Sequence, residues 1–358
     1  MKSKKIWLVA LLIIVMVFSV GCSSQPASTP APAPGDQPKE LVPFKIGIPV
    51  SPPCLVHLAP YLAMEKGFFE EVGLLVTEED LIEFEGGVQS LRGSASGGLD
   101  VAGTSADPLI IAAAAGGGVK GIGTYAPKLS VSMVVQPGIN SIEDLRGKKI
   151  GIQEIGGFSE VMARALLDSV GMSPDDVQYV NVSTAGRVTG LVTGQIDAAP
   201  LHIDQYYSAL SEKGDLQIVA NMWDILPEWW YSAYMVTDEQ LANPEQRANL
   251  VAFETAIMKA QRFMYENKEE TIDIAVKYTK RSREAESKAY DFLAEGGIWA
   301  VNDGMPENML EYTINKQVEI GTIEEKNKPT FEQVIDTSIA EEALKNLGGR
   351  MTGDPRWY

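Results

Sequence analysis

Short apolar runs alternate with stretches of helical periodicity over the first two thirds of the chain. The run from Lys45 to Val50 predicts a buried strand, and Ser51-Pro52-Pro53 predicts a stiff loop after it. A helix follows, and Gly67 is suited to end it because glycine accepts the left-handed backbone conformation. A second strand, Leu74 to Val76, completes a βαβ unit, whose first turn is a common ligand position in α/β sheets.

The same alternation returns twice. A predicted strand from Leu99 to Gly103 leads through Thr104-Ser105 into an apolar helix. Further on, Gly156-Gly157-Phe158-Ser159 opens another helix after a strand. The order of helix end, glycine, strand and Asp occurs at 91–102 and again at 191–199. This echo indicates an α/β protein with two similar lobes.

Helical spacing replaces the alternation from Asn243 to about Lys345, and we interpret these helices as cover for the lobes. The 358 residues suffice for two lobes, and 45% hydrophobic and 22% charged residues are ordinary for a globular protein. A formal charge of −18 argues against nucleic acid as a partner, since phosphate binding needs a basic face. Cys22 and Cys54 are the only cysteines, so no disulfide framework is implied.

The first residues have the layout of a secretory signal, with lysines before an apolar run from Ile6 to Val20. The run ends at Ser19-Val20-Gly21-Cys22, which resembles the lipobox of bacterial lipoproteins, although leucine is usual where Ser19 stands. We expect a signal peptide over 1–22, lipidation of Cys22 and a Pro/Ala/Ser-rich tether over 23–43. The alternative is a cysteine that merely ends a signal peptide or membrane anchor.

Signatures of common catalytic chemistry are missing from the sequence. The pattern GxGxxG at 116–121 follows a helix and precedes a strand, which is the reverse of a dinucleotide site. The motifs GxxxxGK[ST], HExxH and GxSxG do not occur, and His57 and His202 are the only histidines. We therefore expect no cofactor, no metal site and no catalytic residues.

Strand-to-helix turns are the best candidates for a ligand site. Thr104-Ser105 and Gly157-Phe158-Ser159 place hydroxyls and free N–H groups at helix starts, which favours acceptor or anionic groups; ordinary N-capping is the alternative. Rings crowd the stretch WDILPEWWY at 223–231, where some would line a cleft and others would enter the core. Arg187 is interpreted as a solvated helix residue, and pairing with a carboxylate or sulfonate is the alternative. The predicted ligand-binding residues are Ser51, His57, Thr104, Ser105, Tyr125, Gly157, Phe158, Ser159, His202 and Trp230.

The run APYLAMEKGFFEEVGL at 59–74 resembles the opening helix of the SsuA/THI5-like (NMT1) solute-binding proteins, which carry A-x-E-K-G-x-F-x-x-x-G-L there. GLDVA at 98–102, LRGKKIG at 145–151 and LVTGQIDA at 191–198 also match. The resemblance implies a two-lobed periplasmic-binding-protein fold, type II-like, with two hinge crossovers and a ligand cleft between the lobes. It implies lobe I at 44–135 plus 233–358 and lobe II at 136–232.

Membership also implies an extracytoplasmic, lipid-anchored protein that captures a small organic solute for the permease and ATPase of an ABC importer. Family solutes include sulfonates, nitrate, aromatic carboxylates and pyrimidine precursors of thiamine. Neither of the two best turns carries Arg or Lys, so we favour a neutral or aromatic solute over a compact oxyanion. Two alternatives stay open, an enzyme of pyrimidine or thiamine-precursor synthesis and a ligand-sensing module of a membrane receptor.

Overall fold

The computed structural model describes residues 40–354. The expected signal peptide, the lipidation site at Cys22 and most of the expected tether lie outside the described residues. Within 40–354, no helix combines the length and the apolar character needed to cross a bilayer.

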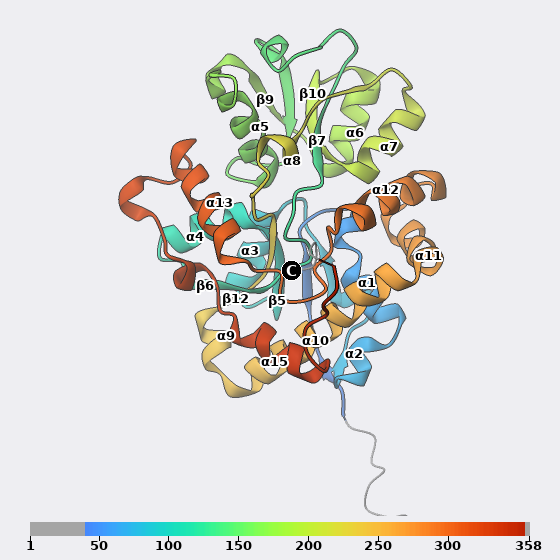
Figure 1. The fold of residues 1–358 in the computed structure, drawn as a ribbon, viewed down its shortest axis with the longest axis vertical. Helices are drawn as coiled ribbons and strands as arrows, with labels where there is room; N and C mark the ends of the chain where they lie inside the picture. The colour runs from blue at the N-terminus through green and yellow to red at the C-terminus, as the bar shows by residue number, and fades with distance from the viewer. Residues whose placement is uncertain (1–39, 355–358) are drawn as a thin grey trace, which may run out of the picture. The chain divides into compact units, whose positions relative to one another are not determined.

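One five-stranded sheet is built mostly from the first part of the chain. Its β2 runs parallel to β4 and β5, whereas β12 pairs antiparallel with both β5 and β6. Helices α3 and α4 lie against this sheet (Figure 1). The strands in order across the sheet are β4 (Leu81–Glu83), β2 (Ile46–Ile48), β5 (Val101–Ser105), β12 (Ser232–Thr237) and β6 (Val119–Gly123).

The other five-stranded sheet has the same plan. Its β8 runs parallel to β9 and β10, and β7 pairs antiparallel with both β10 and β11. The strands in order are β9 (Gln178–Asn181), β8 (Lys149–Ile152), β10 (Ala198–His202), β7 (Val131–Val135) and β11 (Gln217–Asn221). Each sheet therefore contains one strand that runs antiparallel to both of its neighbours. In the first sheet β12 lies between β5 and β6, and in the second β7 lies between β10 and β11.

A repeated hydrogen bond confirms the echo seen in the sequence. Each sheet contains the tetrapeptide Lys-Ile-Gly-Ile, at 45–48 and at 149–152. The backbone N–H of Lys45 donates to Asp100 Oδ2 at 2.7 Å, and that of Lys149 donates to Asp197 Oδ2 at 2.8 Å. Asp100 thus ties the segment before β5 to the start of β2, and Asp197 ties the segment before β10 to the start of β8.

The strand pairing refines where we place the lobe boundaries. The expected division assigned residues up to 135 to lobe I, whereas β7 lies in the second sheet. It also assigned residues from 233 to lobe I, and β12 does lie in the first sheet. We therefore propose that the first crossing lies between Gly123 and Val131 and the second between Asn221 and Ser232.

The opening βαβ unit differs from the expectation in one respect. The strand expected at Leu74 to Val76 appears as β3 (Leu74–Leu75), but it pairs with β1 (Val42–Pro43) in a separate two-stranded ladder. The first strand after β2 that pairs with it is instead β4, which begins seven residues after the start of β3. The expected helix stop is present, since Gly67 has a φ of 70°.

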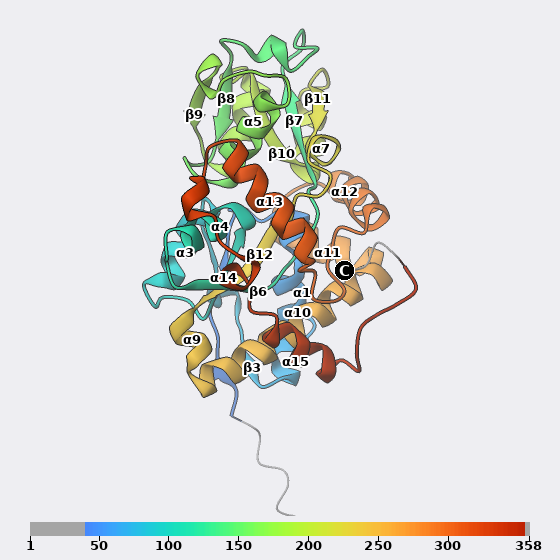
Figure 2. The ribbon, with the colours of Figure 1, turned by 60° about the vertical axis from the view of Figure 1, so that its left-hand side comes forward.

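Helices complete the layers. The long α10 is capped at Asn243, whose Oδ1 accepts from two backbone N–H groups, and α10 lies beside α1 and α15 (Figure 2). Helix α12 packs against α7, which follows a strand of the second sheet. The helices are α1 (Ala59–Glu65), α2 (Phe68–Glu71), α3 (Gly87–Ala95), α4 (Ala106–Ala114), α5 (Phe158–Asp168), α6 (Thr184–Thr193), α7 (Ile203–Glu212), α8 (Met222–Ile225), α9 (Asp238–Ala242), α10 (Pro244–Glu266), α11 (Lys268–Thr279), α12 (Arg283–Gly296), α13 (Glu307–Glu319), α14 (Phe331–Val334) and α15 (Ser338–Asn346).

Candidate functional site

A small hollow lies where the carboxyl edges of the two sheets meet. Strands β2, β5 and β6 of the first sheet and β8 and β10 of the second all end beside it, so both sheets contribute side chains. Its free volume is about 20 Å³, which is room for about one water molecule. The lining residues are Pro49, Val50, His57, Gly87, Ser105, Tyr125, Gln153, Glu154, Phe158, His202 and Tyr231.

Rings form one wall of the hollow. Tyr231 Oη lies 3.3 Å from His202 Nε2 and 3.5 Å from His57 Nε2. Phe158 stacks on His202 with ring centroids 6.1 Å apart, and it contacts Tyr231 at 4.9 Å. His57 packs against Tyr125 at 4.8 Å. A flat solute in the hollow would therefore meet ring faces and ring edges from both sheets.

The ionisable rings are held in their neutral forms. Burial, reinforced by the positive charge of Arg281, lowers the pKa of His57 to about 3. Burial and then the neighbouring His57 place the pKa of His202 well below its usual value. Burial raises the pKa of the Tyr231 hydroxyl. Each neutral imidazole offers one donor and one acceptor.

Arginines lie near the hollow but do not line it. Arg187 is buried rather than solvated, which corrects the sequence interpretation. Its guanidinium donates to the Pro200 carbonyl, and burial lowers its pKa to about 10. Arg281 pairs with the buried Asp204 at 3.0 Å. Among the residues that line the hollow, the only ordinarily charged side chain is Glu154.

Hydrogen bonds join the two sheets' segments beside the hollow, and we refer to the residues that make them as the seam. The Gln153 side-chain amide donates to the Glu85 carbonyl at 2.8 Å, and Glu154 Oε1 accepts from the Val88 backbone N–H at 2.9 Å. The Thr184 backbone N–H donates to Glu85 Oε2 at 3.3 Å. The seam therefore consists of Gln153, Glu154 and Thr184 on one side and Glu85 and Val88 on the other.

The structure brings five of the ten predicted residues together around the hollow. These are His57, Ser105, Tyr125, Phe158 and His202. Whether they bind a solute stays a prediction.

The other five lie outside the lining. Thr104 is buried directly before Ser105 on β5, and Ser159 Oγ accepts from the Gln153 N–H at 2.8 Å as part of the turn. Gly157 caps α5, and Ser51 Oγ donates to Glu83 at 2.7 Å. Trp230 is fully buried, and its indole N–H donates to the Gly304 carbonyl at 2.9 Å. Trp230 is therefore packed in the core and does not line the hollow, and a role for it in ligand binding stays a prediction.

Sequence reasoning missed three polar lining residues. Tyr231 belongs to the aromatic stretch that the sequence singled out, and it directly follows the residue chosen there. Gln153 and Glu154 follow β8 and precede the Gly156-Gly157 turn, so the position at the strand's carboxyl end was the available signal.

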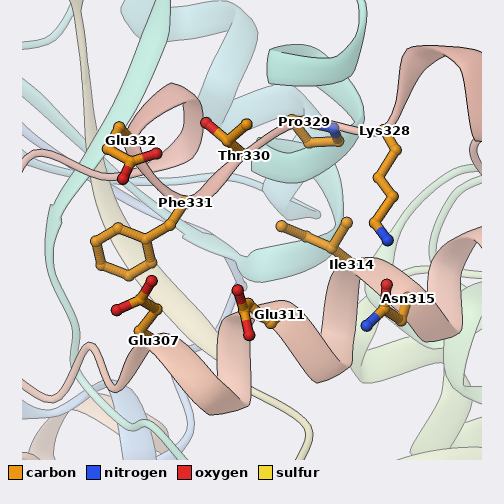
Figure 3. Close-up of a pocket in the computed structure, with 9 residues that line it drawn as sticks. All are labelled: Glu307, Glu311, Ile314, Asn315, Lys328, Pro329, Thr330, Phe331 and Glu332. Carbon is orange, nitrogen blue, oxygen red and sulfur yellow. The ribbon is translucent and has the colours of Figure 1, made fainter.

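A larger hollow of about 450 Å³ lies elsewhere, between α13 and the segment 328–332 (Figure 3). Ile314, Pro329 and Phe331 form its apolar part, and Glu307, Glu311 and Glu332 surround it. It receives no side chain from the carboxyl edges of the sheets. Size alone therefore does not make it the candidate site.

Comparison with known proteins points to one family. The family model described as NMT1/THI5 like matches residues 55–271. A protein of Brucella abortus described as a binding protein is 28% identical over 291 residues, covering 78% of this chain and 87% of that protein. The formylaminopyrimidine-binding protein of Halalkalibacterium halodurans is 25% identical over 228 residues, covering 62% of this chain and 66% of that protein.

Solved structures share the fold. The alkanesulfonate-binding protein SsuA of Xanthomonas axonopodis pv. citri, bound to MOPS, superposes with a TM-score of 0.66 at 16% identity, covering 85% of this chain and 98% of SsuA. This likeness confirms the expected α/β periplasmic-binding-protein fold.

Proposed function

The chain belongs to the NMT1/THI5-like family, and from this premise we propose that it is the extracytoplasmic solute-binding protein of an ABC importer. The observation that carries the proposal is the hollow at the joined carboxyl edges of two α/β sheets, lined from both sides by polar side chains and rings. Ligands of open α/β sheets bind at such edges. Binding proteins named among its relatives support the same role.

The lining favours a planar heterocycle that is neutral or weakly basic. Two neutral imidazoles and the Tyr231 hydroxyl present donors and acceptors but no formal positive charge. A sulfonate or nitrate would bring a full negative charge toward Glu154 with no lysine or arginine in the lining to compensate it. Phe158 and Tyr125 add faces for stacking.

Capture proceeds by relative movement of the two lobes. A volume of about 20 Å³ admits no organic solute, so the seam must open for entry and the solute must then lie between Tyr231 and the two histidines. The two crossing segments act as the hinge. The filled protein then delivers its solute to the permease, which the ATPase drives, and the lipid at Cys22 keeps it at the membrane.

Binding without turnover suits the chemistry of the site. A general base at neutral pH needs a pKa near 7, whereas the pKa values of both histidines lie far below that. The lining contains no cysteine or lysine that would act as a nucleophile. We therefore favour a binding protein over an enzyme of pyrimidine synthesis.

A thermal-shift screen tests the proposal, because a solute that binds the folded protein raises its melting temperature. The panel contains aminopyrimidines, other flat heterocycles, alkanesulfonates, nitrate and aromatic carboxylates, each at 1 mM as a rough starting concentration. We expect stabilisation by at least one heterocycle and none by the oxyanions. A flat response to every class would refute the proposed role for these solutes.

A further inference from the structure

The side chain of Glu154 reaches from the end of β8 to the first turn of α3 in the other sheet's lobe. Its Oε1 accepts from the Val88 N–H at 2.9 Å. A β-carbon at Gly86 would overlap the same carboxylate, and one at Gly157 would lie 2.6 Å from Glu154 Cγ. Two glycines, one from each lobe, thus form a slot that the glutamate side chain fills.

The position that the carboxylate occupies is suited to an anion. Helix α3 spans nine residues, and the N–H groups of its first turn, which have no acceptor within the helix, attract negative charge. Ser105 stands next to this turn, since a β-carbon at Gly87 would lie 3.3 Å from the Ser105 nitrogen. Ser105 is only 5% exposed and lines the hollow together with Gly87 and Glu154.

The hydroxyl of Ser105 is a second indication that the start of α3 is suited to an anionic group. It approaches the Asp107 carboxyl, but its Oγ makes no hydrogen bond of normal geometry with the described residues. A buried hydroxyl without a partner is costly, so a hydrogen-bonding group from the solute side is expected there. The α3 turn and Ser105 lie beside the same hollow, and at the α3 turn the Glu154 carboxylate supplies the anionic group, since it accepts from the Val88 N–H.

Occupancy by Glu154 also ties anion exclusion to closure of the seam. Gln153 and Thr184 contact Glu85, the residue directly before Gly86, so the bond from Val88 to Glu154 is one of three adjacent bonds across the seam. In the closed protein, a sulfonate or carboxylate at the α3 turn would compete with Glu154 for the Val88 N–H, so its binding would cost one of these three bonds.

We propose that Glu154 is a specificity-determining residue, a built-in carboxylate that fills the anion site at the start of α3 and excludes solutes bearing an anionic group there. This inference rests on the proposed function, because it assumes that a solute binds in the hollow. Removal of the carboxylate should therefore open the site to small anions, whichever heterocycle the wild-type protein prefers.

The experiment measures methanesulfonate binding by isothermal titration calorimetry to the full-length protein and three variants. E154A vacates the slot, and E154Q keeps an acceptor for Val88 without the charge. E85A is the matched control, since it removes a neighbouring seam contact but leaves Glu154 on the α3 turn. Circular dichroism and the unfolding midpoint check folding, and E154S replaces E154A if the alanine variant does not fold.

We expect E154A to bind methanesulfonate at least tenfold more tightly than the wild type, with E154Q gaining less and E85A gaining nothing. Equal affinity in E154A and wild type would overturn the proposal. An equal gain in E85A would overturn it as well, because loosening of the seam would then be the cause. Failure of the proposed function would show differently, as a wild-type protein that no heterocycle stabilises, and the comparison of anion affinities would stand regardless.

Discussion

Replacing Asp204 by alanine should lower the free energy of unfolding by about 3–5 kcal/mol. Asp204 lies in the first turn of α7, two residues after His202, and its side chain is 2% exposed. Its carboxylate pairs with Arg281 at 3.0 Å and accepts from the Leu55 N–H at 3.1 Å. Leu55 opens the short helical turn that carries His57, so one carboxylate ties both histidine-bearing segments together.

The magnitude follows from what the substitution leaves behind. The Arg281 side chain is only 8% exposed. Without Asp204, the main hydrogen-bond acceptor left to its guanidinium would be the Pro53 carbonyl. Loss of the partner of a buried charge costs about 3–5 kcal/mol, and the Leu55 N–H would lose its acceptor too. The buried Glu286 carboxyl also attracts Arg281 and offsets part of this cost, so the lower end of the range is expected. The matched control is D291A, since Asp291 pairs with Lys268 at the surface and its side chain is 62% exposed. That variant should cost less than about 1 kcal/mol.

Urea unfolding of the two variants and the wild type, followed by circular dichroism, measures these costs by linear extrapolation. We also expect D204A to bind the solute more weakly, because His57 and His202 lose their common anchor. A cost for D204A below about 1 kcal/mol, equal to that of D291A, would refute the reasoning that this buried pair holds the site together.

Three further changes have defined outcomes. Y231F should weaken solute binding about five- to tenfold, measured by calorimetry, while the free energy of unfolding changes little. The Tyr231 hydroxyl lies between two histidines, and one neutral hydrogen bond contributes about 1 kcal/mol. An unchanged affinity would exclude Tyr231 from the site. W230A should lower the free energy of unfolding by about 3–5 kcal/mol in urea titrations, since Trp230 is fully buried, and a surface-like cost would contradict its core position. Burial raises the pKa of Asp107 to about 8. The free energy of unfolding should therefore fall as pH rises from about 4 to 8, by up to about 1.4 kcal/mol per pH unit for this group. D107N should reduce that slope, and an unchanged slope would show that Asp107 ionises normally.

Local patterns in the sequence predicted elements well and pairing partners less well. Gly67 marked a helix end, and the Asp echo marked two equivalent strands, because both signals depend on neighbours in the chain. The pairing of β3 with β1 was not predictable in this way. Contacts between distant segments decide which strands pair. The apolar run at 74–76 would fit equally well beside β2 in the five-stranded sheet or beside β1 in the two-stranded ladder.

The candidate site shows the same division. Ser105 was found because it stands in a strand-to-helix turn, and His57 because it lies in the loop that follows a strand, whereas His202 was chosen as one of only two histidines. Trp230 was chosen where Tyr231 lines the hollow, because neighbouring residues of an extended segment point to opposite faces and the pattern did not say which face met the second sheet. Burial of Arg187 depends on β10, whose Pro200 carbonyl it contacts, so helix periodicity alone left it solvated.

The most direct measurement is a crystal structure of the protein grown with the heterocycle that stabilises it most in the thermal-shift screen. We expect the solute between the two sheets, hydrogen-bonded to Tyr231 and to at least one of His57 and His202, with no sulfonate or nitrate binding there in parallel soaks. A solute bound instead in the hollow beside α13, or an oxyanion held at the wild-type sheet edges, would contradict the proposed site and its preference.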